Sequence, residues 1–325
     1  PGGTAGFVDA SARAGCPGLA DLNAGAGPGL PTGIGPVPSN IVDGVRIGPG
    51  VALLAAAVRP NLVVRCGTRV RRIRVVGGRA VGVDAEGPEG PIELTADRIV
   101  LSAGAIGSAH LLMLSGVGDE AVLSAAGIPL VVPAPVGRRC SDHPEWVLPV
   151  GWPDAPGRTV LEVVLSLADG IEIRPYSYGF AAMVGADAPT DRRHVGVALM
   201  NPRSRGRITV MSADPAVPPR IEHRYDSEPG DVADLARGVE LVRELVTAAS
   251  EVGRPQWSTS QHLCGSAPMG ADGDDAAVVD PRCRVRGVAG LWVVDGSVLP
   301  AIPSRGPHAS IVMLGHRAAE FVAAG

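Results

Sequence analysis

The sequence predicts an α/β fold, α+β overall, in which an antiparallel-sheet domain is inserted into a domain of alternating strands and helices. Strand–turn–helix order occurs in "DRIVLSAGAIGSAHLLMLSG" (97–116), and again where "GLWVVDGS" (290–297) precedes a helical pattern. Between these stretches, residues 142–231 alternate apolar and polar side chains, as half-buried antiparallel strands do. The order therefore predicts three blocks, 1–141, 142–255 and 256–325, the second inserted between the other two.

The composition excludes several classes of function. A chain of 325 residues with 46% hydrophobic and 19% charged residues suits two globular domains or one large α/β unit. A net charge of -4 and only 3% aromatic residues argue against a nucleic-acid partner. All 29 basic residues are arginines. Without lysine there is no Schiff-base enzyme and no P-loop for ATP or GTP.

The cysteines and the apolar runs bear on cellular location. The five cysteines are scattered without a C-x-x-C pair, which argues against a disulfide framework or a zinc site, so we expect no bound metal. No apolar run approaches membrane-spanning length and no signal peptide is visible, although the chain starts without Met. These features predict a cytoplasmic protein with no transmembrane segment.

The individual elements follow from local patterns. We expect loops with short elements over 1–50, where Gly and Pro abound, and a short strand in "NLVVR" (61–65). β-Branched residues on both sides of Gly77-Gly78 predict a hairpin. Further strands are expected in "RTVLEVVLSL", "GIEIRPYSYGF" and "HVGVALM…RGRITVMS", the last pair joined by "NPRSRGR". Helices are expected over 231–250 and over 310–322, the latter with the stripe Ile311, Leu314, Ala318 and Phe321.

Three motifs are candidates for a site. Asp295 and Gly296 end an apolar strand at the sheet edge where ligands bind, although an ordinary turn is the commoner reading. His308 precedes a helix expected to start near Ser310, whose N-terminus could stabilise negative charge, or it is a plain surface cap. His262 stands in a loop of small residues, "QHLCGSAPMG", where a structural histidine is the commoner case. The chain has no G-x-G-x-x-G, since "GAGPGL" lacks the third glycine and follows no strand.

Taken in order, six stretches resemble the glucose–methanol–choline (GMC) oxidoreductases, a family of FAD enzymes. They are "DLN…PSNIVDGVR" with "RPNLVVRCGTRVRRI", "GAIGSAHLLMLSGVG", "VGRRCSDHP", "NPRSRGRITVMSADPAVPPRIEHRY", "QHLCGSAPMG" and "VVDPRCRVRGVAGLWVVDGSVLP…HASIVMLGHRAAEFV". The second departs from the family at Ala109, where Pro or Ser is usual. The resemblance implies an FAD/NAD(P)-binding-type domain in the first and third blocks and a substrate-binding domain in the second.

The resemblance also implies the chemistry and the residues that perform it. His262 would face flavin N5 and the substrate hydroxyl, acting as base or hydrogen-bond partner while hydride leaves the carbinol carbon. His308 would be the second catalytic position. The residues implied to contact FAD are Val70, Ala103, Gly104, Asp295, Gly296, Ser297, His308, Ala309 and Ser310. The substrate would be a small-molecule alcohol, with oxygen, a quinone or another carrier as electron acceptor.

One departure from the family leaves alternatives open. The family begins with a βαβ unit that carries G-x-G-x-x-G, and nothing of that kind is found here, so the chain looks like the C-terminal two-thirds of such an enzyme. We expect FAD affinity to fall without that pyrophosphate-binding turn. A hydroxynitrile lyase on the same scaffold and an inactive truncated fragment are the alternatives. The lysine-free composition resembles actinobacterial members, including those associated with the mycofactocin redox cofactor.

Overall fold

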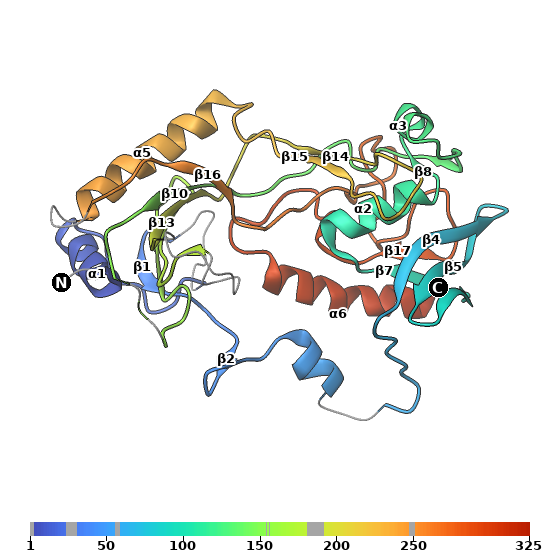
Figure 1. Cartoon of the computed structure of the whole chain (residues 1–325), viewed down its shortest axis with the longest axis horizontal. Coiled ribbons are helices and arrows are strands. Elements are labelled where there is room, and N and C mark those ends of the chain that lie inside the picture. Colours follow the sequence, from blue (N-terminus) through green and yellow to red (C-terminus); the bar gives the residue numbers. More distant parts are fainter. Residues whose placement is uncertain are drawn as a thin grey trace. The chain divides into compact units, whose positions relative to one another are not determined.

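The computed structural model describes residues 3–23, 31–55, 59–153, 155, 157–180, 192–246 and 251–325 (Figure 1). By their internal contacts the residues form two compact units, each built from three stretches of chain. Unit 1 consists of Pro1–Ile47, His143–Ser204 and Tyr225–Gln261. Unit 2 consists of Gly48–Asp142, Arg205–Arg224 and His262–Gly325.

Unit 1 is built on a six-stranded antiparallel sheet in the order β1-β11-β12-β13-β10-β16. The strands are β1 (Gly33–Pro36), β10 (Pro144–Pro149), β11 (Val163–Ser166), β12 (Ile171–Pro175), β13 (His194–Leu199) and β16 (Gln256–Thr259). Because side chains alternate along a strand, Ile171 and Ile173 of β12 enter the apolar core while Glu172 and Arg174 point to the other face. The sheet confirms the antiparallel strands predicted from the alternating pattern.

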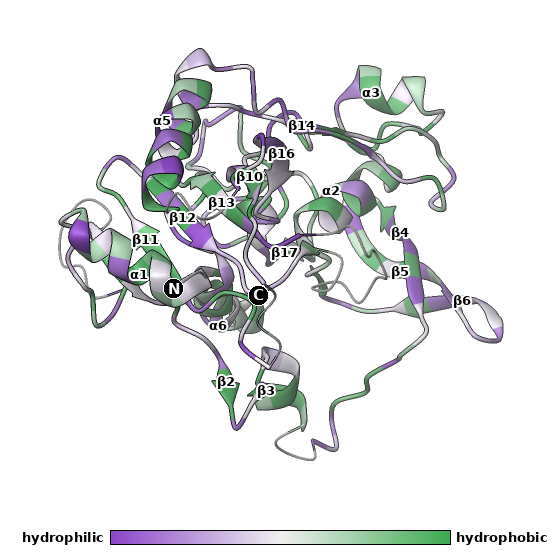
Figure 2. Ribbon diagram, turned by 60° about the vertical axis from the view of Figure 1, so that its left-hand side comes forward, coloured by the Kyte–Doolittle hydropathy of each residue, from purple (hydrophilic) through white to green (hydrophobic). Residues whose placement is uncertain are grey.

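Two helices complete unit 1. Helix α5 (Pro229–Leu245) has Pro in its first turn, where a missing N–H costs nothing, and buries Leu235, Val239 and Val242 in the core with β12 and β13. Figure 2 shows hydrophilic and hydrophobic colours alternating around α5. Helix α1 (Gly3–Arg13) lies in a stretch predicted to be mostly loop, and its Phe7 is fully buried in the same core. Residues 247–250, the end of the predicted 231–250 helix, lie outside the described residues.

The grouping of residues 1–47 differs from the predicted blocks. The prediction placed them with residues up to 141, whereas their contacts place them in unit 1. Strand β1 pairs with β11 through the register Gly33↔Ser166 to Pro36↔Val163, and this pairing accounts for the grouping. A short ribbon, β2 (Ile41–Val42) with β3 (Val45–Arg46), follows in the same unit.

Unit 2 begins with the predicted hairpin. Strands β4 (Arg69–Val76) and β5 (Arg79–Gly87) pair antiparallel around Gly77 and Gly78, which have φ of 57° and 75°, the left-handed values that a two-residue turn requires. A third strand, β6 (Gly90–Thr95), pairs with β5 and was not predicted. Residues 61–65, predicted as a strand, form no strand in the structure and are exposed.

The strand–turn–helix prediction is confirmed in unit 2. Strands β7 (Ile99–Leu101) and β17 (Leu291–Val293) form a parallel pair, and helices α2 (Gly104–Leu114) and α6 (His308–Ala324) follow them along the chain. The predicted stripe of α6 is its least exposed face, with Ala318 in the core and Leu314 and Phe321 packed against it. Smaller elements are η1 (Gly50–Ala55), β8 (Val117–Gly118), α3 (Glu120–Ala125), β9 (Val132–Pro133) and η2 (Gly296–Val298).

The segment "NPRSRGR" joins two strands as predicted, but the two strands belong to different sheets. Strand β13 belongs to the sheet of unit 1, whereas β14 (Arg207–Thr209) pairs with β15 (Arg220–Glu222) in unit 2. Backbone bonds between Cys140 and Gly206 attach this hairpin to the rest of unit 2. Among the described residues, no helix is both long and apolar enough to cross a membrane.

Candidate functional site

The loop that carries His262 is held in place by the segment around Asp142, and both belong to unit 2. Ser141 and Cys264 exchange backbone hydrogen bonds of 2.9 and 2.8 Å. The backbone N–H of His262 donates to Asp142 Oδ1 at 2.9 Å. Asp142 is buried, with an exposed fraction of 5%, so this charge-assisted bond is little weakened by water. The backbone of His262 is therefore fixed on both sides.

The imidazole of His262 lies against the backbone of Gly306. A Cβ built on Gly306 would stand 3.4 Å from His262 Nε2 and 3.5 Å from Cε1, which is ordinary van der Waals contact, so the ring packs beside this glycine. Gly306 comes two residues before His308, and two residues span about 7 Å at most. The structure thus brings the two predicted catalytic histidines into neighbouring segments of unit 2.

Helix α6 begins two residues earlier than predicted, at His308 rather than near Ser310. Pro307 takes the cap position and makes no side-chain capping bond, so His308 is not the cap but the first helical residue. A proline supplies the φ that the start of a helix needs, and this explains the shift. His308 and Ala309 are exposed, while Ser310 is half-buried.

The carboxylate of Asp295 ties the end of β17 to the start of α2. Its Oδ2 accepts from the backbone N–H of Gly104 at 3.0 Å and from Ser108 Oγ at 2.5 Å. Its Oδ1 accepts from the backbone N–H of Ser297 at 2.8 Å. A carboxylate has about four acceptor positions, so little capacity remains for a ligand hydroxyl. The hydrogen bonds of Asp295 therefore mainly fix two backbone segments of this chain.

The segment after Asp295 connects the His262 loop to α6. Backbone N–H groups of Gly265 and Ala267 donate to the carbonyls of Gly296 and Ser297 at 3.0 and 2.9 Å. A Cβ on Gly296 would lie 3.2 Å from Ile311 Cδ1, which shows how closely the first turns of α6 pack on this backbone. The predicted residues at 262, 295–297 and 308–310 thus lie on segments that contact one another.

Val70 and Ala103 lie on a separate hollow of about 500 Å³, bordered by β4, β7 and α2. His110 also lines it, and its Nε2 is buried without a hydrogen-bond partner in the described structure. Burial, and after it the charge of Arg69, lowers the pKa of His110, which favours the neutral ring. Gly104 begins α2 with a φ of 78° and open space where a Cβ would stand.

These features fit a bound dinucleotide. Ser297 Oγ is fully buried and has no partner in the described structure, so its hydrogen-bonding capacity is unused. The hollow beside Ala103 follows the carboxyl end of a parallel strand, where α/β sheets bind cofactors.

The sequence reasoning assigned no role to Asp142, Ser108 or His110. Asp142 stood in a quoted motif, "VGRRCSDHP", but its bond to a residue 120 positions away has no local signal.

Comparison with known proteins identifies the family. Residues 5–145 and 202–315 match the amino- and carboxy-terminal domains of the GMC oxidoreductases. An uncharacterised GMC-type oxidoreductase of Rhodococcus erythropolis is 40% identical over 310 residues, covering 89% of this chain and 62% of the relative. An oxygen-dependent choline dehydrogenase of Vibrio vulnificus is 31% identical, covering 97% and 66%. The chain belongs to the GMC oxidoreductase family, and it spans less than two thirds of the length of these two relatives.

Solved structures agree with this assignment. Pyridoxine 4-oxidase from Mesorbium loti superposes with a TM-score of 0.83 at 26% identity, covering 98% of this chain and 68% of that one. Formate oxidase from Aspergillus oryzae, in a structure described for its FAD modification, gives 0.82 at 22%, covering 98% and 70%. The predicted fold class and the predicted family are confirmed. None of the proteins named here is a hydroxynitrile lyase.

Proposed function

We propose that the chain takes part in the FAD-dependent oxidation of a small-molecule alcohol to an aldehyde or ketone. The observation that carries the proposal is the fixed position of His262, whose backbone N–H is bonded to buried Asp142 and whose ring lies against Gly306. Relatives and neighbours named choline dehydrogenase and pyridoxine 4-oxidase support an alcohol as the substrate class. When bound, the flavin supplies the hydride acceptor.

His262 is the proposed base or hydrogen-bond partner of the substrate hydroxyl. An imidazole takes up a proton near neutral pH, and general base catalysis requires a side chain held within hydrogen-bonding reach of that proton. The two backbone attachments of its loop supply the rigidity, and the ring packs beside Gly306 through its Nε2 side. His308, exposed at the start of α6, is the proposed second polar group near the reacting oxygen.

The proposed cofactor contacts divide into two groups. Gly104, Asp295, Gly296 and Ser297 form one bonded set, in which Asp295 positions the backbone of its neighbours and the buried Ser297 hydroxyl has no partner in the described structure. Val70 and Ala103 border the hollow that we assign to another portion of the dinucleotide. His110, with its buried and unpartnered Nε2, joins the second group as a proposed contact.

The test is anaerobic reduction of the bound flavin by a panel of alcohols, including choline, pyridoxine and benzyl alcohol. We expect His262→Ala to slow flavin bleaching by roughly 100-fold or more while FAD stays bound, since general base catalysis typically supplies that factor. The matched control is His316→Ala, which removes an exposed histidine from α6 and leaves the rate unchanged. An unchanged rate in His262→Ala would refute its role, and no bleaching of the unaltered protein by any alcohol would refute the reaction.

A further inference from the structure

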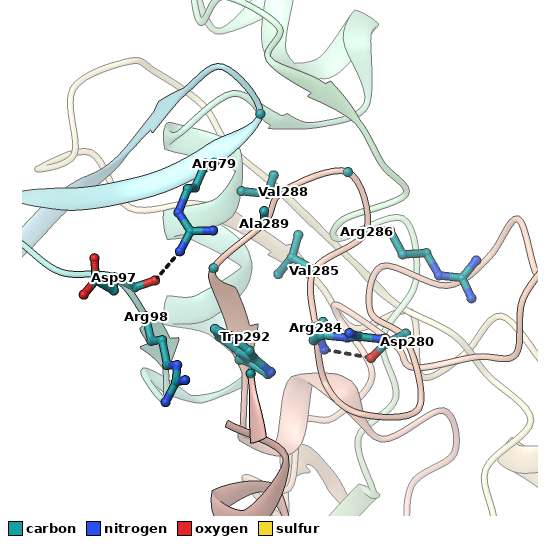
Figure 3. Close-up of a pocket in the computed structure, with 14 residues that line it drawn as sticks. Arg79, Asp97, Arg98, Asp280, Arg284, Val285, Arg286, Val288, Ala289 and Trp292 are labelled. Carbon is teal, nitrogen blue, oxygen red and sulfur yellow. Dashed lines mark hydrogen bonds and ion pairs between the residues drawn. The ribbon is translucent and has the colours of Figure 1, made fainter. Parts of the chain in front are cut away.

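A second hollow of about 620 Å³ lies in unit 2, at the other end of the parallel strand pair. It is bordered by residues that precede β7, by the β4–β5 turn and by the loop before β17, and it contains Arg79, Asp97, Arg98, Asp280, Arg284 and Trp292. Figure 3 shows Arg79, Asp97 and Arg98 on one side, Arg284 and Asp280 on the other, and Trp292 between them. The proposed cofactor residues follow the carboxyl ends of these strands, so this hollow has no part in the proposed reaction.

The hollow holds more hydrogen-bond donors than acceptors. Arg98 has no hydrogen-bond or ion-pair partner in the described parts of the chain. Arg79 donates through one nitrogen to the backbone carbonyl of Asp97 at 3.0 Å, and Arg284 donates through Nε to Asp280 at 2.7 Å. A fourth arginine, Arg286, bonds to three backbone carbonyls. The acidic side chains that border the hollow are Asp97 and Asp280, fewer than the four guanidinium groups.

Trp292 gives the second, independent observation. Its side chain lines the hollow with an exposed fraction of only 3%, and its Nε1 has no hydrogen-bond partner in the described structure. An indole N–H only donates, and a buried donor without an acceptor is rare in folded proteins. A ligand oxygen in the hollow would satisfy it, together with the open donors of Arg98 and Arg284.

We propose that this hollow binds a small molecule through a phosphate or pyrophosphate group. Guanidinium groups pair with phosphate oxygens through two parallel hydrogen bonds, and several converging on one group favour more than a single negative charge. The nearly buried Trp292 adds a fixed neutral donor. The proposal does not depend on the proposed alcohol oxidation, because none of the residues that border this hollow is assigned to that site.

The test is calorimetric titration of the chain with pyrophosphate in the presence of saturating FAD, so that the residues proposed to contact the cofactor are occupied. We expect one site per chain, with binding weakened about tenfold in Arg98→Ala through loss of one charge-assisted contact, and severalfold in Trp292→Phe. The matched control is Arg282→Ala, which removes an exposed arginine of the same loop that does not border the hollow. It should change the affinity by less than about twofold.

Each contrary result overturns the proposal. If Arg282→Ala weakens binding as much as Arg98→Ala, the attraction is general surface charge. If citrate binds as tightly as pyrophosphate, the hollow does not select phosphate. If FAD abolishes pyrophosphate binding, the ligand occupies the cofactor site instead, and if the unaltered chain binds no pyrophosphate there is no such site. Circular dichroism of each variant confirms that the fold is kept, and Arg98 is exposed, so its replacement leaves the core intact.

Discussion

Replacing Asp295 with Asn tests whether this carboxylate organises the proposed cofactor site. Its two oxygens accept from three donors, namely the backbone N–H groups of Gly104 and Ser297 and the hydroxyl of Ser108. An amide has one oxygen and one NH₂ group. Whichever way the Asn side chain turns, at least one of the three donors then faces another donor.

The structure sets the size of the effect. The better orientation keeps the oxygen toward Gly104 and Ser108 and loses the bond to Ser297. One hydrogen bond to a charged group contributes about 1.5–3 kcal/mol, and Asp295 is only 5% exposed, so solvent does not replace it. We therefore expect Asp295→Asn to lower the free energy of unfolding by about 2 kcal/mol. If FAD must restore the same arrangement, its binding weakens by up to roughly thirtyfold.

Urea unfolding measures the first effect and quenching of FAD fluorescence measures the second. The matched control is Asp272→Asn, which makes the same chemical change at an exposed loop residue and should alter stability by less than about 0.5 kcal/mol. Equal behaviour of the two variants in both assays would refute the bracing role of Asp295. Loss of stability with unchanged FAD affinity would show that the brace serves the fold and not the cofactor.

Two further predictions concern burial. Gly196→Ala should lower the free energy of unfolding by about 3 kcal/mol, because its Cβ would overlap the buried carboxylate of Glu145 and lie 3.0 Å from Tyr176 Cε2. The control is Gly18→Ala, where the added Cβ has open space and stability should not change. Unchanged stability in Gly196→Ala would contradict this packing. Burial raises the pKa of Cys264 to about 12, so its reactive thiolate is scarce at pH 8 and increases only as the pH approaches 12 or the chain unfolds. Iodoacetamide at pH 8 should label exposed Cys66 and spare Cys264, as mass spectrometry would report, and equal labelling of the folded chain would contradict the burial.

The sequence predicted those elements whose pattern is local. The hairpin at Gly77-Gly78 and the stripe of α6 were found because turn chemistry and helical spacing act over a few residues. Helix α1 was missed because its burial depends on Phe7 meeting the distant strands of unit 1. The apolar run 61–65 was wrongly predicted as a strand because its local pattern is not matched by a partner. A β-branched stretch forms a strand only where another strand accepts and donates its backbone hydrogen bonds.

The residues of the candidate site also differ in whether a local sequence pattern reveals them. His262, Asp295 and His308 were found because they stand in motifs that can be read in order along the chain. Their partners could not be found that way, since Asp142 and Ser108 act across separations of 120 and 187 residues. For this reason the structure adds a role to Asp295 that the sequence did not indicate, while its contact with FAD stays a prediction. As a strand-end carboxylate it suggested a direct ligand contact, whereas its observed bonds make it mainly a brace for Gly104 and Ser297.

The unpartnered atoms at the proposed cofactor site connect folding with binding. Ser297 Oγ and His110 Nε2 are buried without hydrogen-bond partners in the described structure, and each such group costs about 1–3 kcal/mol. A ligand that supplies partners removes this penalty only in the folded state, so its binding shifts the unfolding equilibrium toward the folded chain. FAD should therefore stabilise unit 2 against unfolding. The stabilisation should shrink in Ser297→Ala, because that variant no longer has the hydroxyl group whose penalty the cofactor relieves.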